Sequence, residues 1–503
     1  MASMKKLLSD SVVYGLSSIV GRFLNYLLVP LYTYHISAAS GGYGVVTNIY
    51  AYTALLLVLL TFGMETTFFY FANKERGEGG GGSKAVFPRR IFSTTLGAVG
   101  SVGLTFVVLV LALLQPIAGA MGYENHPDYI AVMAVVVSID AFQAILFARL
   151  RFENRAWKFA ALKLAFIVGN IGLNLLVFLV APRLQHLSWM QWYDEQNNVG
   201  YIFYINLICT ALVTLGFVKE LKDFRLRNFD KQTLKSMLRY AWPLLILGVV
   251  GILNQVADKI LFPYLMPGHE GEVQLGIYGA CVKIAMIMAM ITQAFRYAYE
   301  PFVFAGGRSA QSRESQAVVM KYFVMFTLLA FLAVVSYMDL FKYVIKSDYW
   351  EGLRAVPIVM LGEIMMGVYF NLSFWYKLTE KTWWGAVMSA VGCVVMVMMN
   401  VVLVPRIGYM GCAWGGLAGY GVCVVLSYTI GQRHFKVPYP VAAIVGYFVL
   451  AMALYFLNGA VRPDSLWLRL LWGTLMLGIY GAVLMWNERE LVGKVMRKIG
   501  IKG

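Results

Sequence analysis

The feature that most constrains this chain is a near-continuous succession of apolar stretches, each about 20 residues long or longer and separated by short polar segments. Of the 503 residues, 60% are hydrophobic and only 14% are charged, which leaves too little polar surface to cover a soluble globule of this size. A helix of about 20 residues crosses the hydrocarbon core of a bilayer, and backbone groups in lipid must be hydrogen-bonded within their own segment. The sequence therefore predicts an all-α integral membrane protein.

About fourteen stretches are long enough to cross the bilayer. They lie at residues 11–35, 43–72, 91–115, 128–149, 158–181, 199–219, 238–265, 273–300, 316–338, 352–376, 383–404, 409–431, 438–459 and 466–486. We expect a multi-pass protein of about 14 transmembrane helices.

The distribution of Lys and Arg predicts the orientation, because cytoplasmic loops collect these residues. With the N-terminus inside, the inner segments hold most of the basic residues, as at 219–235 and 489–502. The outer loops then hold few: Arg183, Lys342, Lys346, Arg406 and Arg462. Both termini are thus predicted to be cytoplasmic. The net charge of +16 follows from this topology, and no nucleic-acid partner is needed to explain it.

The reactive residue types give no sign of an enzyme or a cofactor. The five cysteines all fall within predicted helices, so a disulfide framework is not expected. The five histidines are scattered singly, without the spacing of metal ligands. A glycine-rich nucleotide-binding loop is also missing from the sequence. We expect no metal, no cofactor and no catalytic residue.

An internal repeat relates two groups of six predicted helices. Tyr43-Gly44 and Glu65 in the second helix are matched, at a constant offset of 235 residues, by Tyr278-Gly279 and Glu300 in the eighth. At an offset of 223 residues, Asp140 is matched by Glu363. The matches are few and chance competes with them. A true repeat predicts two six-helix lobes in the same orientation, with a site at their interface. The predicted domains are 1–222 (N-lobe, helices 1–6), 223–436 (C-lobe, helices 7–12) and 437–503 (helices 13–14 and a cytoplasmic tail).

Five stretches resemble one known family. They are MKKLLSDSVVYGLSSIVGRFLNYLLVPLYTYHI, FGMETTFFYFANK, ARLRFENRAWKFAALK, NQVADKILFPYLM and QAFRYAYEPFVFA. In this order they resemble the polysaccharide-transporter branch of the multidrug/oligosaccharidyl-lipid/polysaccharide (MOP) exporter superfamily, which includes the O-antigen flippases. The resemblance runs over nearly the whole chain.

The resemblance implies a flippase of the bacterial inner membrane that moves polyprenyl-diphosphate-linked oligosaccharide to the outer leaflet by alternating access, for surface polysaccharide biosynthesis. The implied partners are this lipid-linked substrate, the bilayer and other membrane proteins of polysaccharide assembly. We expect a monomer. The alternatives are a multidrug or cation antiporter of the same fold, and a membrane polysaccharide polymerase or ligase.

Charged and amide side chains near the middle of predicted helices are the candidate substrate and coupling residues. A charge at that depth costs about 2.5–3.5 kcal/mol on insertion scales, so such side chains usually face a protein interior or a wet cavity. Because cationic side chains suit phosphate oxygens, the predicted diphosphate and sugar site comprises Arg22, Lys283, Asn25 and Asn48. Asp140 and Glu363 are predicted to couple transport to protons or sodium, since buried carboxylates can take up protons. Internal ion pairs, Arg22 with Asp140 and Lys283 with Glu363, are the alternative.

Glu65 and Glu300 lie deeper along their helices and are assigned to the cytoplasmic mouth. Tyr43 precedes Glu65 by 22 residues, roughly 33 Å of helix. The hypothesis is a cytoplasmic gate, formed by these two glutamates with the nearby Arg149, Arg151 and Arg296. The alternative is that each glutamate forms a local ion pair that anchors an inner loop.

Overall fold

The computed structural model describes residues 26–78, 87–188, 192–461 and 463–489, without the side chains of residues 76–78, 298, 301, 305 and 306. Helices make up nearly all of this part of the chain, and none of it forms a strand. Thirteen helices are long and apolar enough to cross a membrane. They match the second to the fourteenth predicted stretches, so the prediction of an all-α membrane protein is confirmed. The first stretch, 11–35, lies mostly outside the described residues, and the count of fourteen and the orientation stay predictions.

The described residues up to 265 form a first series of helices. They are α2 (Leu28–His35), α3 (Gly42–Thr61), α4 (Met64–Glu78), α5 (Arg89–Ala112), α6 (Leu114–Met121), α7 (Pro127–Phe152), α8 (Ala156–Leu175), α9 (Asn198–Leu215), α10 (Val218–Leu221) and α11 (Lys231–Leu265). A π-helical turn and a 3₁₀ turn extend α8 to Leu184.

The remaining helices complete the chain. They are α12 (His269–Gly306), α13 (Ala310–Ser336), α14 (Met338–Phe341), α15 (Val356–Leu372), α16 (Phe374–Leu378), α17 (Trp383–Ile407), α18 (Met410–His434), α19 (Val441–Ala460) and α20 (Leu466–Asn487). A 3₁₀ segment, η8 (Ser347–Ala355), leads into α15.

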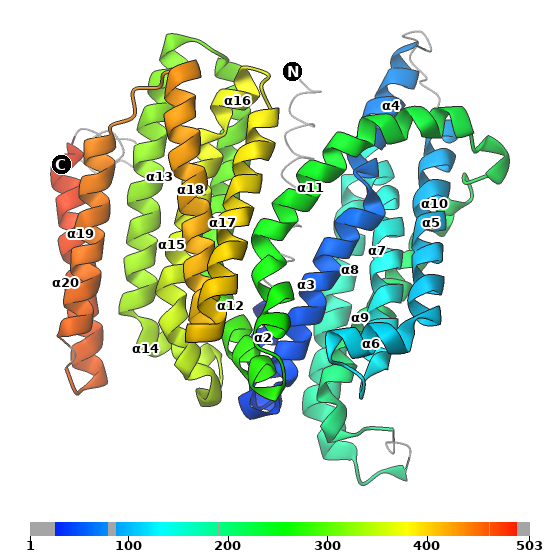
Figure 1. The fold of residues 1–503 in the computed structure, drawn as a ribbon, viewed down its shortest axis with the longest axis horizontal. Helices are drawn as coiled ribbons and strands as arrows, with labels where there is room; N and C mark the ends of the chain where they lie inside the picture. The colour runs from blue at the N-terminus through cyan, green and yellow to red at the C-terminus, as the bar shows by residue number, and fades with distance from the viewer. Residues whose placement is uncertain (1–25, 79–86, 189–191, 462, 490–503) are drawn as a thin grey trace. The chain divides into compact units, whose positions relative to one another are not determined.

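By contacts the chain forms two compact units. The first comprises residues 1–279 and 400–409, and the second comprises 280–399 and 410–503. The first unit extends past the predicted boundary at residue 222 because α11 packs on α3, α4 and α5, and α3 also packs on α7 (Figure 1). The second unit includes the last two helices, since α19 and α20 pack on α13. The predicted lobes rest on a sequence repeat rather than on packing, and they stay a prediction.

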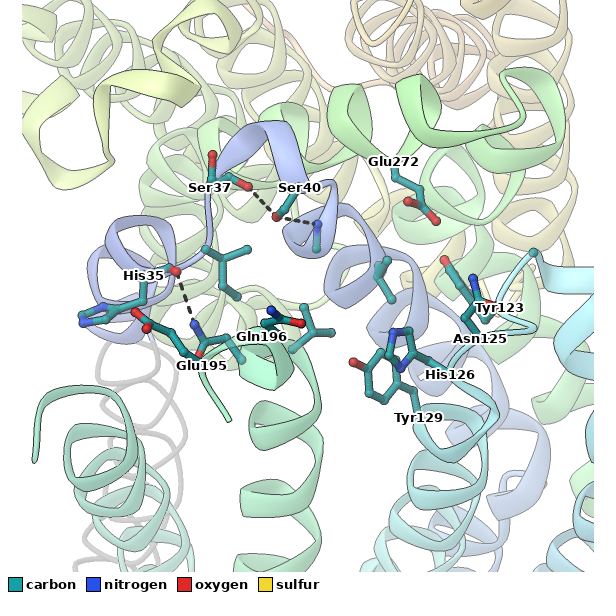
Figure 2. Close-up of a pocket in the computed structure, with 16 residues that line it drawn as sticks. His35, Ser37, Ser40, Tyr123, Asn125, His126, Tyr129, Glu195, Gln196 and Glu272 are labelled. Atoms are coloured by element: carbon teal, nitrogen blue, oxygen red, sulfur yellow. Dashed lines mark hydrogen bonds between the residues drawn. The ribbon is translucent and has the colours of Figure 1, made fainter. Parts of the chain in front are cut away.

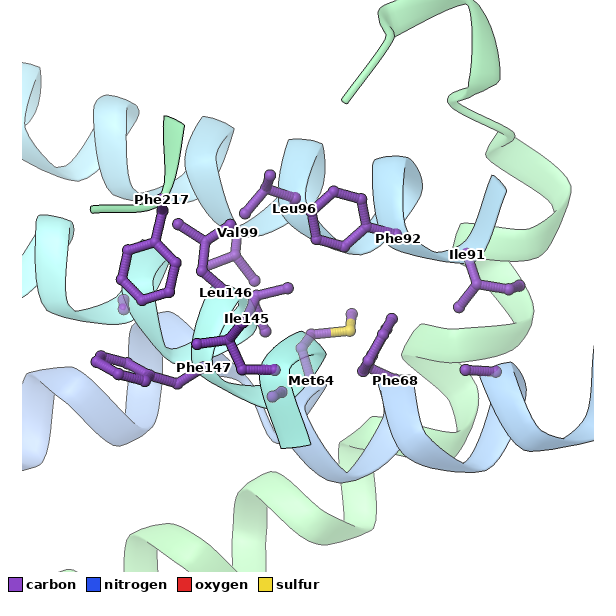
Figure 3. Close-up of a cluster of buried hydrophobic side chains, with 14 of the residues drawn as sticks. Met64, Phe68, Ile91, Phe92, Leu96, Val99, Ile145, Leu146, Phe147 and Phe217 are labelled. Carbon is purple, nitrogen blue, oxygen red and sulfur yellow. The ribbon is translucent and has the colours of Figure 1, made fainter. Parts of the chain in front are cut away.

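The core of the first unit forms where α4, α5 and α7 meet. Phe68 of α4, Phe92 of α5 and Ile145 of α7 are fully buried there, as Figure 3 shows. Fully burying one such side chain contributes about 1.5–3 kcal/mol where water is the reference, but in lipid the gain comes mostly from close packing. This core fixes the ends of α4 and α7, on which the charged residues described below lie.

The second apolar stretch is broken, where the sequence predicted one helix over 43–72. The helix α3 ends at Phe62, whose φ of +51° is uncommon for a bulky side chain, and Gly63 follows with φ +67°. Gly63 also lies against α11, since a Cβ on it would be 3.0 Å from the Cβ of Leu244. Glu65 therefore lies in the first turn of a new helix, where the helix dipole favours a carboxylate.

A proline in α11 explains one buried polar contact of the first unit. Pro263 has no N–H, so the carbonyl of Lys259 loses its partner within the helix. The amide of Asn48, on α3, donates to this carbonyl at 2.8 Å, and its oxygen accepts from the Tyr123 hydroxyl at 2.9 Å. Neighbouring side chains often satisfy backbone groups freed by proline in membrane helices.

Candidate functional site

Four charged side chains form a connected group inside the first unit, which we call the interior charge group. Glu65 lies on α4, Arg151 and Asp140 on α7, and Lys163 on α8. Arg151 donates to Glu65 at 2.6 Å. Lys163 interacts electrostatically with Asp140, Glu65 and Arg151. The group thus connects the end of α7 with its middle.

Asp140 lies close to the midpoint of α7, at the depth that the sequence predicted. Eleven residues separate it from Arg151, about 16 Å along the helix axis. Lys163, eight residues into α8, is half-buried, and its ammonium nitrogen lies 4.2 Å from the centre of the Phe147 ring. A cation over an aromatic face is attracted by the ring. The lysine is therefore held between an aromatic ring and the carboxylates, inside the unit.

Lys163 was missing from the predicted site. Its place just after the inner loop suggested a side chain reaching back to the interface. The signal in the sequence is its position eight residues into an apolar helix that follows the helix of Asp140, but only packing shows that the two face each other.

A second group of charges lies where the connection from α7 to α8 meets α10, and here Arg149 has a structural role. This arginine is 5% exposed and donates to Glu153 at 2.8 Å, to the carbonyl of Glu220 at 2.7 Å and to Asp223 at 2.5 Å. Its guanidinium also lies 4.2 Å from the centre of the Phe87 ring. All three guanidinium nitrogens are occupied within this unit.

Glu220 is the buried anion of this second group. Its carboxylate, without exposed side-chain surface, pairs with Arg155 at 2.5 Å and with Lys158 at 2.6 Å. Burial alone would raise the pKa of the Glu220 carboxyl. The hydrogen bond from Lys158 and the charges of Lys158 and Arg155 outweigh burial and hold that pKa below its ordinary value. Ion pairs therefore hold α10 against the start of α8 in this unit.

In the second unit, Glu300 also pairs locally. Its carboxylate lies 3.2 Å from the ammonium of Lys377 and 3.4 Å from the guanidinium of Arg296, one helical turn earlier. A small hollow beside them is lined by both cations, by Thr292 and by Tyr299. The hydroxyls of Thr292 and Tyr299 are buried and have no hydrogen-bond partner. In this conformation both gate glutamates have partners from their own unit, as the alternative hypothesis expected.

The remaining predicted residues fall into three places. Lys283 on α12 and Glu363 on α15 are both half-buried in the second unit. Asn48 is 1% exposed, and both its amide atoms are bonded as described above. Arg22 and Asn25 lie outside the described residues. Two of the four predicted diphosphate and sugar residues thus lie outside the described part of the chain, and the binding role of all four stays a prediction.

The described residues hold no group of three or more His, Cys, Asp or Glu side chains that could bind a metal ion. What these side chains offer instead is a set of ionisable groups within a helical membrane protein. Such an arrangement can bind ions and charged headgroups and can exchange ion-pair partners.

Comparison with known proteins identifies the family. A family described as "Polysaccharide biosynthesis protein" matches residues 7–296, more than half of the chain. The chain belongs to this family. The sequence resemblance to the polysaccharide-transporter branch is thereby confirmed. No curated protein matches the sequence.

Solved structures show which fold the family member has. A structure titled lipid II flippase MurJ, in an inward closed conformation, matches with a TM-score of 0.70 and 12% identity, over 96% of this chain and all of that one. An inward-facing multidrug resistance MATE family transporter of the MOP superfamily matches with a TM-score of 0.64 and 15% identity, over 82% of this chain and 94% of that one. An outward-facing MATE structure matches with a TM-score of 0.54, also at 15% identity, over 85% and 95%. The fold is that of the MOP-superfamily transporters.

Proposed function

We propose that this chain is a flippase that moves polyprenyl-diphosphate-linked oligosaccharide from the inner to the outer leaflet of the bacterial cytoplasmic membrane by alternating access. The observation that carries the proposal is a charge group held inside the apolar helices of a polysaccharide-biosynthesis family member. A structural protein of the membrane has no need of an aspartate at mid-depth, where each charge is costly.

In this mechanism the substrate headgroup needs cations, and Arg22 and Lys283 are proposed to supply them. An arginine offers a planar fork of donors to phosphate oxygens, and a lysine offers a compact charge. Asn25 is proposed to bond the sugar. Asn48 is the weakest of these candidates, since both its amide atoms already have protein partners.

Energy coupling is proposed to act on the return of the empty carrier. A potential of 100 mV contributes about 2.3 kcal/mol per elementary charge. The inside-negative potential drives the anionic diphosphate outward, and it favours a reset in which a cation moves inward with the carrier. A proton or sodium ion on Asp140 or Glu363 would supply that cation. Lys163, as the electrostatic neighbour of Asp140, would offset part of the cost of burying the carboxylate charge when no ion is bound.

Flipping of a fluorescent polyprenyl-diphosphate sugar in proteoliposomes tests the proposal. We expect wild type to flip it, and Arg22→Ala and Lys283→Ala to lose activity while remaining folded. Asp140→Asn is expected to flip at a rate that no longer responds to an imposed proton or sodium gradient. Absence of flipping by the folded wild type would refute the proposal, and export of cationic drugs by the same vesicles would establish the antiporter alternative.

A further inference from the structure

A polar cavity of about 410 Å³ lies at the end of the first unit opposite the ion pairs of Arg149 and Glu220. Four segments line it: the connection from α2 to α3, the connection from α6 to α7, the turn η5 (Glu195–Asn197) with the start of α9, and the start of α12. All four belong to the first unit. Sites for small molecules usually measure about 300–1,000 Å³, so this cavity can hold a small organic ligand.

Close backbone packing builds one wall of the cavity. A Cβ on Gly44 would lie 1.9 Å from the carbonyl oxygen of Glu272, so only glycine allows α3 to approach α12 this closely. Gly276 faces the same contact, since its Cβ would lie 2.9 Å from the nitrogen of Gly44. The contact places the carboxylate of Glu272 at the cavity. Figure 2 shows this side chain above Tyr123 and Asn125.

Amide and carboxylate groups line the opposite side. Figure 2 shows Glu195 and Gln196 across the space from Asn125 and His126. Glu195, Gln196 and Asn125 are exposed. The side-chain oxygen of Asn198 is buried and has no hydrogen-bond partner. These groups offer several acceptors and amide donors within one small volume.

The two histidines of the lining are held in defined orientations. The Nδ1 atom of His35 lies 2.8 Å from the carbonyl oxygen of Leu31, so Nδ1 donates to this carbonyl. His126 lies flat on Tyr129, with ring centroids 4.7 Å apart and planes at 3°. The Tyr129 hydroxyl donates to Asn197 at 3.2 Å, which fixes the stacked pair.

The charges of the lining select against an anion. The cavity is lined by the carboxylates of Glu195 and Glu272, and neither a lysine nor an arginine is among the described residues that line it. A diphosphate would be repelled there, because like charges at short range are unfavourable. A neutral ligand rich in hydroxyl groups can donate to the carboxylates and to Asn198, and can accept from the amides of Asn125 and Gln196.

The position of the cavity fits the far side of the membrane. The helix α7 runs from the cavity to the ion pairs of the inner loops, and its 26 residues span about 39 Å. Basic loops face the cytoplasm, so the cavity opens on the outer face.

We propose that this cavity is an outer-face subsite for one neutral sugar unit of the translocated glycan. The inference rests on the proposed function, because it assumes that a glycan reaches the outer face. It separates the two ends of the substrate: the diphosphate is bound by cations elsewhere, and the sugar is bound by acceptors and amides here.

Protection of an introduced thiol tests this inference directly. All five native cysteines are buried, so Gln196→Cys adds an accessible thiol at the cavity, and Ser465→Cys adds an exposed one outside it as a control. Purified full-length protein in nanodiscs is treated with a charged maleimide in the presence of free neutral mono- and disaccharides, or of inorganic pyrophosphate. A free sugar of about a dozen heavy atoms binds such sites with a Kd on the order of 1 mM, so the saccharides are tested above that concentration.

We expect at least one saccharide to slow the labelling of Gln196→Cys several-fold and to leave the labelling rate of Ser465→Cys unchanged. This protection should disappear when Glu195→Gln and Asn125→Ala are added to Gln196→Cys. Pyrophosphate is expected to protect neither thiol. Lack of protection by every saccharide, or protection by pyrophosphate alone, would overturn the inference. The flipping assay on the wild-type protein separates the two proposals: flipping by wild type without protection of Gln196→Cys removes the subsite and keeps the flippase, whereas protection without flipping by wild type removes the flippase and keeps a sugar site.

Discussion

The contact between Asn48 and the proline turn of α11 gives a prediction that can be worked out in magnitude. Asn48→Ala removes the donor to the Lys259 carbonyl and the acceptor of the Tyr123 hydroxyl. Each buried polar group left without a partner costs about 1–3 kcal/mol, so the sum for the two groups is about 2–6 kcal/mol. Polar contacts between membrane helices average only about 0.6 kcal/mol when measured by double-mutant cycles. We therefore expect a loss of unfolding free energy between about 1 and 4 kcal/mol.

The proline supplies a second-site test of the cause. In Pro263→Ala the residue regains an N–H, which can donate to the Lys259 carbonyl within α11. Asn48→Ala should then cost about 1–2 kcal/mol less in the Pro263→Ala background than in wild type, because the carbonyl is no longer left unpaired. Tyr123→Phe removes only one of the two contacts and should cost less than Asn48→Ala.

Equilibrium unfolding in mixed micelles, titrated with a denaturing detergent, measures these differences. Asn174→Ala is the matched control, since Asn174 is also fully buried but donates within its own helix, to Asn170. An unchanged stability of Asn48→Ala together with a loss of flipping would refute the structural reading and return Asn48 to the substrate site. Equal costs in the two Pro263 backgrounds would refute the explanation by the freed carbonyl.

Three further predictions use single contacts. The native pKa of the Glu220 carboxyl is lowered, so its ion pairs stabilise the fold above the unfolded pKa of about 4.3. This stabilisation is lost as the pH falls through the lower native pKa. Glu220→Gln should abolish this pH dependence and should cost about 1–3 kcal/mol of unfolding free energy at neutral pH in the same unfolding assay. Gly44→Ala should lower the unfolding free energy by about 1–3 kcal/mol, because its Cβ clashes with α12. Gly251→Ala is the control, since open space surrounds its Cβ, and it should leave the stability unchanged. Equal stabilities of the two variants would contradict the packing argument. Glu65→Gln removes a half-exposed pair and should cost less than about 1 kcal/mol while reducing flipping; unchanged flipping would end the gate hypothesis.

The membrane helices could be predicted because the length of an apolar stretch is enough to identify a segment that crosses the bilayer. Thirteen of the predicted stretches recur as helices, with ends that differ by a few residues. The break at Phe62-Gly63 was missed, since an apolar run of 30 residues reads as one long helix unless the close approach of α11 is known. Pro263 predicts a freed carbonyl in its helix, but the donor to that Lys259 carbonyl lies 211 residues earlier in the chain, and sequence spacing gives no sign of it.

The candidate site was predicted only in part. Asp140 and Glu65 stood out because carboxylates in apolar helices are rare and costly. Lys163 and Lys377 did not, since a lysine near a helix end also occurs wherever a side chain reaches back to the interface. Which lysine faces which carboxylate depends on helix rotation, and that depends on packing between helices distant in sequence.

By itself the sequence determined that the chain crosses a membrane many times as helices, and it carried the resemblance to the polysaccharide-transporter branch. Both conclusions depend on local composition and on the order of short motifs, and these can be read from the linear sequence. The tertiary structure decided which charges meet, where a proline's carbonyl finds its donor, and that four loops enclose a cavity without a basic side chain among its described residues. The two contacts of Asn48, for example, join residues 75 and 211 positions apart, and their energies arise only when helices pack at a particular rotation and distance.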